Sequence, residues 1–310
     1  MTIAWSRLFE ELSALEYQWQ PLTPDDLLRF RKNPESFSTL LRYFGLGLSA
    51  STAELQRAGL SEDSARAVIR FENEYERPAL SRVAQCFVLH SHWPAKPDAA
   101  AHHVHFGRES LQLLDFMNTF AAPKRLAIDL GASSGGLCLG LAEKWKESGL
   151  TFRAIELSPR AVAYGEAAVE AQGLAARIHF QALKIESNSR APECQNADLI
   201  FFNPPMVQPE PGVALPHRDG GKMGIELPLL FLDFAHRHLR PEGEVLCLCT
   251  NPIVGGRGLF FEALRKLQHF QLLEKKLLNP FFNQSVARKR QHHQEAIEHI
   301  ELWALHLRKR

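Results

Sequence analysis

From residue 124 onward, short apolar runs alternate with segments of helical length, and this alternation constrains the fold more than any other feature. The runs that we expect to form strands are 125–130, 151–157, 176–183, 197–203, 244–251, 271–278 and 299–307. Most of them are separated by helical patterns, which are too long for a hairpin turn. Strands joined in this way are mostly parallel, so the sequence predicts a doubly wound α/β sheet. Such sheets bind their ligands beyond the carboxyl ends of the strands.

The first hundred residues show a different pattern, that of several short helices. Segment 2–19 carries apolar residues at helical spacing, and Thr23 followed by Pro24 is typical of a helix start. The stretch 92–107 is rich in proline, alanine and histidine and is the best linker candidate. We therefore expect a helical N-terminal domain over 1–100 and an α/β domain over 101–310.

Charge and cysteine content narrow the class of protein. The formal net charge is +1, so the chain has no global electrostatic attraction to nucleic acid. The five cysteines are odd in number and form no C-x-x-C pair, which indicates reduced thiols and a cytoplasmic location. No segment has the pattern of a signal peptide or a membrane span, so we expect no membrane association.

The chain turns tightly after the first predicted strand, in the sequence DLGASSGG at 129–136. Its small residues let a ligand approach the backbone, and the following helix presents free N–H groups. One interpretation is a hydrolase, because 131–135 fit the G-x-S-x-G nucleophile elbow with Ser133 as the nucleophile. The other is a cofactor site for a nucleotide-like group. A dinucleotide-binding turn fits poorly, because Ser133 stands where its second glycine would be and the spacing is wrong.

An acidic residue at the end of the second strand favours the cofactor interpretation. Glu156 follows Gly131 by about 25 residues, and the carboxyl ends of neighbouring parallel strands meet at one edge of the sheet. A carboxylate offers two acceptor oxygens, which suits the two hydroxyl groups of a ribose. The sequence therefore predicts that Glu156 and the turn bind one ligand together.

The fourth strand ends in the sequence Asn203-Pro204-Pro205-Met206. The motifs DLGASSGG, IELSPRAV, ADLIFFNPPMV and DGGKMGIELPLL follow one another in the order seen in S-adenosylmethionine-dependent methyltransferases with an NPP[Y/F] motif. Over roughly 104–307 the chain resembles this group, which includes release-factor glutamine methyltransferases and N6-adenine and N2-guanine nucleic-acid methyltransferases. The resemblance implies a Rossmann-like class I methyltransferase domain with a seven-stranded, mostly parallel sheet and an antiparallel C-terminal hairpin.

The resemblance also implies a cofactor and its ligand residues. The cofactor is S-adenosylmethionine, and no metal is expected. The residues that match the binding motifs are Asp129, Gly131, Ala132, Ser133, Gly135, Glu156, Leu157, Ala182 and Asn203. The chain lacks the aspartate that often meets the adenine amine after the third strand, so backbone groups near Ala182 take that role in this interpretation.

The NPP motif supplies the implied catalytic residues, Asn203, Pro204, Pro205 and Met206. In the family, the asparagine side-chain oxygen and the first proline carbonyl accept the two N–H groups of a planar nitrogen. That arrangement aligns the nitrogen with the methyl group to be transferred. Met206 stands where the family has an aromatic residue, and a methionine defines the plane of a flat acceptor less well.

The identity of the acceptor stays open, and we expect the helical N-terminal domain to recognise the substrate or to cover the site. A protein or peptide amide of the glutamine type is the first choice, because the near-neutral charge gives no nucleic-acid footprint. A nucleic-acid base is the second choice, and a small metabolite is the third. A catalytically inert module that binds cofactor or partner is an alternative of another class. No heptad or repeat indicates an oligomeric state, and a metal site at His103 and His105 lacks partners at ligand spacing.

Overall fold

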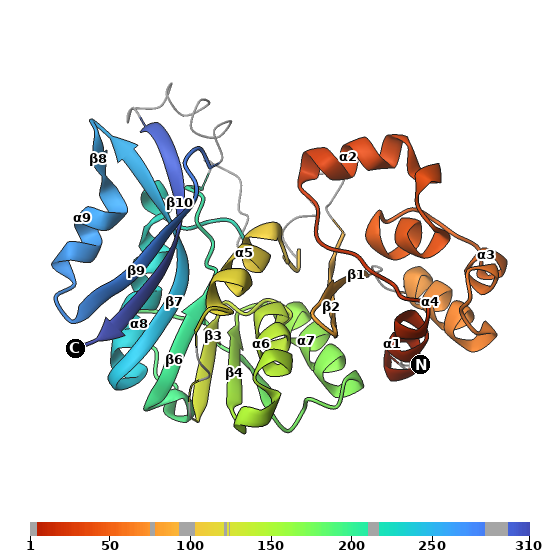
Figure 1. Ribbon diagram of the computed structural model, residues 1–310, viewed down its shortest axis with the longest axis horizontal. Helices are drawn as coiled ribbons and strands as arrows, with labels where there is room; N and C mark the ends of the chain where they lie inside the picture. Colours follow the sequence, from red (N-terminus) through yellow and green to blue (C-terminus); the bar gives the residue numbers. More distant parts are fainter. Residues whose placement is uncertain are drawn as a thin grey trace.

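A computed structural model describes residues 5–74, 78–92, 103–120, 123, 125–209, 217–282 and 297–310. Figure 1 shows an α/β part built around one large sheet, beside a smaller part that contains the N-terminus. The boundary expected near residue 100 and most of the predicted linker lie outside the described residues. Of the segments described, no helix combines the length and the apolar character that crossing a membrane requires.

The large sheet has the predicted α/β architecture. Its strands are β3 (Leu126–Leu130), β4 (Thr151–Glu156), β5 (Ile178–Ala182), β6 (Ala197–Phe202), β7 (Leu239–Val254), β8 (Arg257–Gly258), β9 (Phe270–Asn279) and β10 (Ile297–Lys309). Their order is β5-β4-β3-β6-β7-β10-β9, and the short β8 pairs with β7 outside this row. The pairings from β5 to β7 are parallel, whereas β10 lies antiparallel between β7 and β9. The mostly parallel sheet with an antiparallel C-terminal hairpin is therefore confirmed.

Helices cover both faces of this sheet (Figure 1). They are α5 (Arg108–Met117), α6 (Gly136–Lys144), α7 (Pro159–Ala171), α8 (Glu226–His238) and α9 (Leu259–Lys266). Alternate residues of β3 belong to two separate apolar clusters: Ala127 packs with α5, α6 and α7, and Ile128 packs with α8 and α9. Because side chains alternate along a strand, apolar residues at both parities bury β3 on both faces.

The N-terminal part consists of helices and one hairpin. Its helices are α1 (Trp5–Ala14), α2 (Pro24–Lys32), α3 (Thr52–Arg57) and α4 (Glu62–Glu74), with a 3₁₀ turn at Pro34–Ser36 and a π-helical turn at Leu41–Gly45. Thr23 caps α2 as expected, because its side chain accepts the backbone N–H of Asp26. The helical expectation for 1–100 missed the hairpin of β1 (Pro78–Val83) and β2 (Cys86–Ser91).

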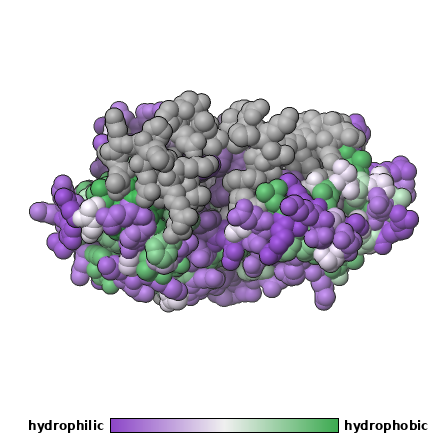
Figure 2. Space-filling view, turned by 90° about the horizontal axis from the view of Figure 1, so that it is seen from above, coloured by the Kyte–Doolittle hydropathy of each residue, from purple (hydrophilic) through white to green (hydrophobic). Residues whose placement is uncertain are grey.

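The burial of the β1–β2 hairpin explains why the sequence did not predict it. Every residue of β2 is buried, so the alternation of polar and apolar residues that marks a half-exposed strand is missing. The hairpin packs against α6 and α7, and a single apolar cluster runs from α1 through the hairpin to these two helices. Figure 2 shows a face on which hydrophilic residues predominate among those coloured, with hydrophobic residues in small groups. The N-terminal part is thus packed onto the sheet domain through its interior.

Candidate functional site

Two cavities adjoin at the carboxyl ends of the parallel strands. The sheet cavity, about 350 Å³, is lined by residues that follow β3, β4, β5 and β6. The N-terminal cavity, about 340 Å³, lies between the end of β6, the hairpin strands and the N-terminal helices. Six residues line both cavities: His103, His105, Phe106, Asn203, Pro205 and His217. The two cavities therefore meet at the NPP motif.

Glu156 organises one wall of the sheet cavity. Its Oε2 accepts the backbone N–H of Ser133 over 2.8 Å, and its Oε1 accepts the backbone N–H of Ser158 over 2.8 Å. The first bond crosses from the end of β4 to the turn after β3, and the second holds the start of α7. A carboxylate oxygen can accept more than one hydrogen bond, so both oxygens keep acceptor capacity toward the cavity.

Ser133 has an unusual backbone conformation and a specific side-chain partner. Its φ is +51°, in the left-handed region where glycine is the usual residue. The hydroxyl donates to the backbone carbonyl of His105 over 2.6 Å. A serine nucleophile needs a base that accepts its proton, such as an imidazole nitrogen, and a main-chain carbonyl is not one. This geometry argues against the hydrolase interpretation.

Asp129 is a buried carboxyl group with an unused oxygen. Its side chain is 1% exposed at the end of β3, and it lines the sheet cavity. The Cys138 thiol approaches Oδ2 at 3.5 Å, whereas Oδ1 has no hydrogen-bond partner within the described part of the chain. Burial raises the pKa of Asp129 to about 8. An unpartnered buried acceptor of this kind suits a cationic or hydrogen-bond-donating ligand.

The far end of the sheet cavity differs in detail from expectation. Leu157 lines it and is 53% exposed. Ala182 and Gly135, both predicted to contact the cofactor, do not line the cavity, since Ala182 pairs with Glu156 in the sheet. The lining there comes instead from Leu183, Lys184, Ile185 and Gly136. The observed lining lies one to three residues beyond Ala182 and one residue beyond Gly135 along the chain.

The Asn203 amide stands where the two cavities meet. Its Nδ2 donates to the Ser110 hydroxyl over 3.0 Å. Pro204 and Met206 line the N-terminal cavity, and Pro205 lines both cavities. Met206 is 8% exposed and belongs to the apolar cluster. The side chain that stands where NPP[Y/F] methyltransferases have an aromatic residue is therefore mostly packed into the core.

The DGGKMG segment supports the backbone of the NPP motif through hydrogen bonds and close packing. The N–H of Val207 donates to the carbonyl of Arg218, and the N–H of Gly220 donates to the carbonyl of Val207, both over 2.8 Å. A Cβ on Gly224 would lie 2.2 Å from the Met206 carbonyl oxygen, and φ at Gly224 is +73°. A Cβ on Gly220 would likewise lie 2.6 Å from the Pro205 carbonyl oxygen, so these two glycines are required for the DGGKMG segment to pack directly on the NPP backbone.

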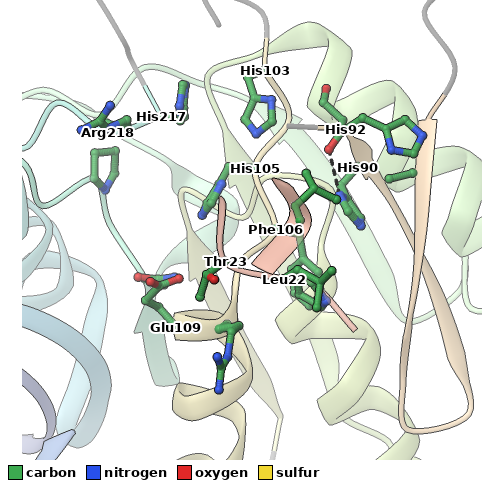
Figure 3. Close-up of a pocket in the computed structure, with 18 of the residues that line it drawn as sticks. Leu22, Thr23, His90, His92, His103, His105, Phe106, Glu109, His217 and Arg218 are labelled. Atoms are coloured by element: carbon green, nitrogen blue, oxygen red, sulfur yellow. Dashed lines mark hydrogen bonds between the residues drawn. The ribbon is translucent and has the colours of Figure 1, made fainter. Parts of the chain in front are cut away.

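Histidines are prominent in the lining of the N-terminal cavity, as Figure 3 shows. The ring of His217 lies 4.9 Å from the ring of His103 and 6.0 Å from that of His105, measured between centroids. Burial lowers the pKa of His105 to about 4 and that of His103 to about 2, so both are neutral at pH 7. Among the residues that the structure describes, no group of three or more His, Cys, Asp and Glu could hold a metal ion.

Sequence reasoning missed a set of residues that come from distant segments. Those that line the sheet cavity without having been predicted include His105, Phe106, Ser110, Ser158, Ala161, His217, Asp219, Leu227 and Phe231. Segment 103–110 precedes the first strand of the sheet domain and carries no glycine-rich or acidic signature.

Comparison with known proteins gives similarity in fold. No protein-family model matches the chain, and the search of curated proteins finds no significant relative. A tRNA m1G37 methyltransferase from M. jannaschii is 14% identical, with a TM-score of 0.47, over 75% of this chain and 54% of that one. A methyltransferase from Pyrococcus furiosus is 15% identical, with a TM-score of 0.43, over 67% and 88% of the two chains. The [4+2]-cyclase SpnF is 16% identical, with a TM-score of 0.45, over 65% and 80%.

Likenesses at this level concern the fold alone. The strand order is that of the Rossmann-like class I methyltransferase domain, in which the last strand of the chain, here β10, lies antiparallel between two other strands, here β7 and β9. Because proteins of one fold catalyse many different reactions, the residues of the site, and not the fold, determine the ligands and the chemistry.

Proposed function

We propose that the protein is an S-adenosylmethionine-dependent methyltransferase that acts on a planar nitrogen. The observation that carries this proposal is the position of Asn203, which lines both cavities. The sheet cavity contains the Glu156 carboxylate, which suits a ribose, and the N-terminal cavity has a suitable size for an acceptor. A group-transfer enzyme needs its two substrates to meet at one point. The NPP motif lies at that point.

The residues of the sheet cavity fit the cofactor. The unpartnered Oδ1 of Asp129 is a suitable acceptor for the cofactor's ammonium group, and Glu156 offers two oxygens to the ribose hydroxyls. Leu183, Lys184 and Ile185 line the part of the cavity left for the adenine, although the Leu183 N–H already donates to the Glu156 carbonyl. When bound, S-adenosylmethionine supplies a methyl group activated by a sulfonium centre. The protein's part is to hold the donor and the acceptor in line and to exclude water.

The residues at the junction fit a planar nitrogen as acceptor. The Oδ1 of Asn203 and the carbonyl of Pro204 would accept the two N–H groups of the acceptor, which turns its lone pair toward the methyl group. Proline rings on both sides of the peptide bond limit how far the carbonyl can move. Neutral His103 and His105 add no positive charge beside the cationic cofactor.

A peptide amide of the glutamine type is the first acceptor class to test, with the N-terminal part as the element that recognises it. A heteroaromatic amine is the second class, and a specific observation favours it. The N-terminal cavity is lined by many rings, including Trp19, Phe106, Phe282 and several histidines. Such rings can stack on a flat acceptor and replace the plane that Met206 does not define.

Two measurements test the proposal. Titration calorimetry should show binding of S-adenosylmethionine in the micromolar range, and an absence of binding at high micromolar concentration would refute the cofactor. The protein is then incubated with methyl-labelled cofactor and with glutamine peptides, oligonucleotides and heteroaromatic amines, and products are read by mass spectrometry. Asn203→Ala should retain cofactor binding and lose label transfer. Binding without transfer to any acceptor would favour the inert module.

A further inference from the structure

One hydrogen bond beside the junction has no role in the mechanism described so far. The Asn203 Nδ2 donates to the Ser110 hydroxyl over 3.0 Å, although the two residues are 93 positions apart in the chain. Ser110 is 7% exposed and lies in the first turn of α5. It lines the sheet cavity, whereas Asn203 lines both cavities. The serine therefore contacts the amide from the cofactor side of the junction.

The position of Ser110 is fixed by its own segment. The Ser110 N–H donates to the Gly107 carbonyl over 3.1 Å. A Cβ on Gly107 would lie 2.7 Å from both the His105 ring and the Glu109 carboxylate, so these groups pack over the glycine. The bond from Ser133 to the His105 carbonyl ties the same segment to the turn after β3. The packing over Gly107 and the hydrogen bond from Ser133 thus both restrain the segment that leads into α5, and they fix the position of the Ser110 side chain.

An asparagine amide has two chemically different ends. Only the Oδ1 end can accept an N–H group from an acceptor, while the Nδ2 end would meet that N–H group with its own hydrogens. If the Nδ2 end bonds to Ser110, the Oδ1 end is the one left for the junction. The opposite orientation, with the hydroxyl donating to Oδ1, would present the wrong end of the amide.

We propose that Ser110 is a positioning residue, whose hydroxyl orients the Asn203 amide so that Oδ1 faces the acceptor. This inference rests on the proposed function, and it assigns Ser110 no contact with the transferred methyl group. Its consequence is that a single hydroxyl, far from Asn203 in the sequence, holds the amide in the productive orientation. Catalytic geometry of this kind is sensitive, since a misplacement of about 1 Å can cost about 100-fold in rate.

The orientation is tested first without any acceptor. Protein labelled with ¹⁵N at asparagine gives one pair of side-chain amide signals per residue, and Asn203→Asp identifies the pair of interest. In the wild type we expect the Asn203 protons to exchange slowly with water, because one of them is bonded to a buried hydroxyl. Ser110→Ala should accelerate this exchange at least fivefold, and Ser110→Thr, which keeps the hydroxyl, should restore it. Ser148→Ala, at a remote serine, is the control.

Turnover with the acceptor found by label transfer is the second readout. Ser110→Ala should lower kcat about tenfold or more while the Kd for S-adenosylmethionine changes less than twofold, and Ser110→Thr should recover most of the loss. Unchanged Asn203 exchange in folded Ser110→Ala would overturn the inference, and so would unchanged kcat. If Asn203→Ala itself keeps full turnover, the proposed function fails instead, so the two failures are distinguishable.

Discussion

Ser133 donates its hydroxyl to the backbone carbonyl of His105 over 2.6 Å, which joins the turn after β3 to the segment that leads into α5. The same residue donates its backbone N–H to Glu156. Ser133 thereby links three segments that are far apart in the chain. It does so from a left-handed conformation, with φ at +51°, that glycine would adopt without strain.

This arrangement predicts different losses of stability for two substitutions. Ser133→Ala keeps the strained φ and loses the hydrogen bond, so we expect unfolding free energy to fall by about 1–2 kcal/mol. Ser133→Gly loses the same bond but relieves the strain, so its stability should lie within about 1 kcal/mol of wild type. Urea unfolding of the three proteins measures the difference. Equal stability of the alanine and wild-type proteins would show that the bond to His105 contributes nothing.

Glu156 should be the residue on which cofactor affinity depends most. Removing its carboxylate in Glu156→Ala leaves the N–H groups of Ser133 and Ser158 without their acceptor and removes the two oxygens that we propose bind the ribose. We expect the Kd for S-adenosylmethionine to rise about 100-fold or more, since two hydrogen bonds to a charged group contribute about 1.5–3 kcal/mol each. Glu170→Ala, at an exposed glutamate of helix α7, which begins shortly after Glu156, is the matched control and should bind normally.

Cofactor binding should depend on pH through Asp129. Burial raises the pKa of this carboxyl to about 8, so it is protonated in the free protein at pH 6. An ammonium group bound at Oδ1 favours the ionised form, so binding releases a proton, and affinity should rise as the pH increases from 6 to 7.5. The slope is at most about tenfold per pH unit. Calorimetry in buffers of different ionisation enthalpy measures the released proton, and Asp129→Asn should show neither the proton nor the slope.

The same carboxyl group should destabilise the ligand-free fold at high pH. Its folded pKa lies above the unfolded value, so its contribution is favourable at low pH and is lost as pH rises toward 8. Asp129→Asn should therefore become more stable than wild type, by a margin that grows about 1.4 kcal/mol per pH unit between pH 5 and 8. Urea unfolding without cofactor at several pH values measures this margin. A constant difference would contradict the raised pKa.

Gly224 supports the NPP backbone through its lack of a side chain. A Cβ there would meet the Met206 carbonyl at 2.2 Å, so Gly224→Ala should displace the motif and lose about 2–4 kcal/mol of stability. Gly173→Ala is a matched control, because φ at Gly173 is +68° and a Cβ would meet no atom within 4 Å. It should lose only about 1 kcal/mol, the cost of the left-handed conformation. If the two variants lose equal stability, contact with Met206 is not the reason for the glycine.

The sequence by itself determined the elements whose signals are local. Alternating apolar runs and helices predicted the parallel sheet, and a capping threonine predicted the start of α2. Strand ends placed Asp129, Glu156 and Asn203 at one edge, because parallel strands end on the same side of a sheet. Residues at the ends of parallel strands can therefore be predicted to share one edge of the sheet, even when the contacts of their side chains are unknown.

Tertiary structure alone decided the rest. The hairpin β1–β2 is buried on both faces and so lacks the alternation that marks a strand in a sequence. Ser110 lies about 90 residues before the NPP motif, and His217 lies about 10 residues after it. Both are brought to the motif by packing between segments, which no local sequence pattern predicts. The residue at 206 illustrates the limit most clearly. The sequence shows a methionine where an aromatic is expected, but only the packed fold shows that this side chain lies largely in the core, while histidine rings line the cavity beside it.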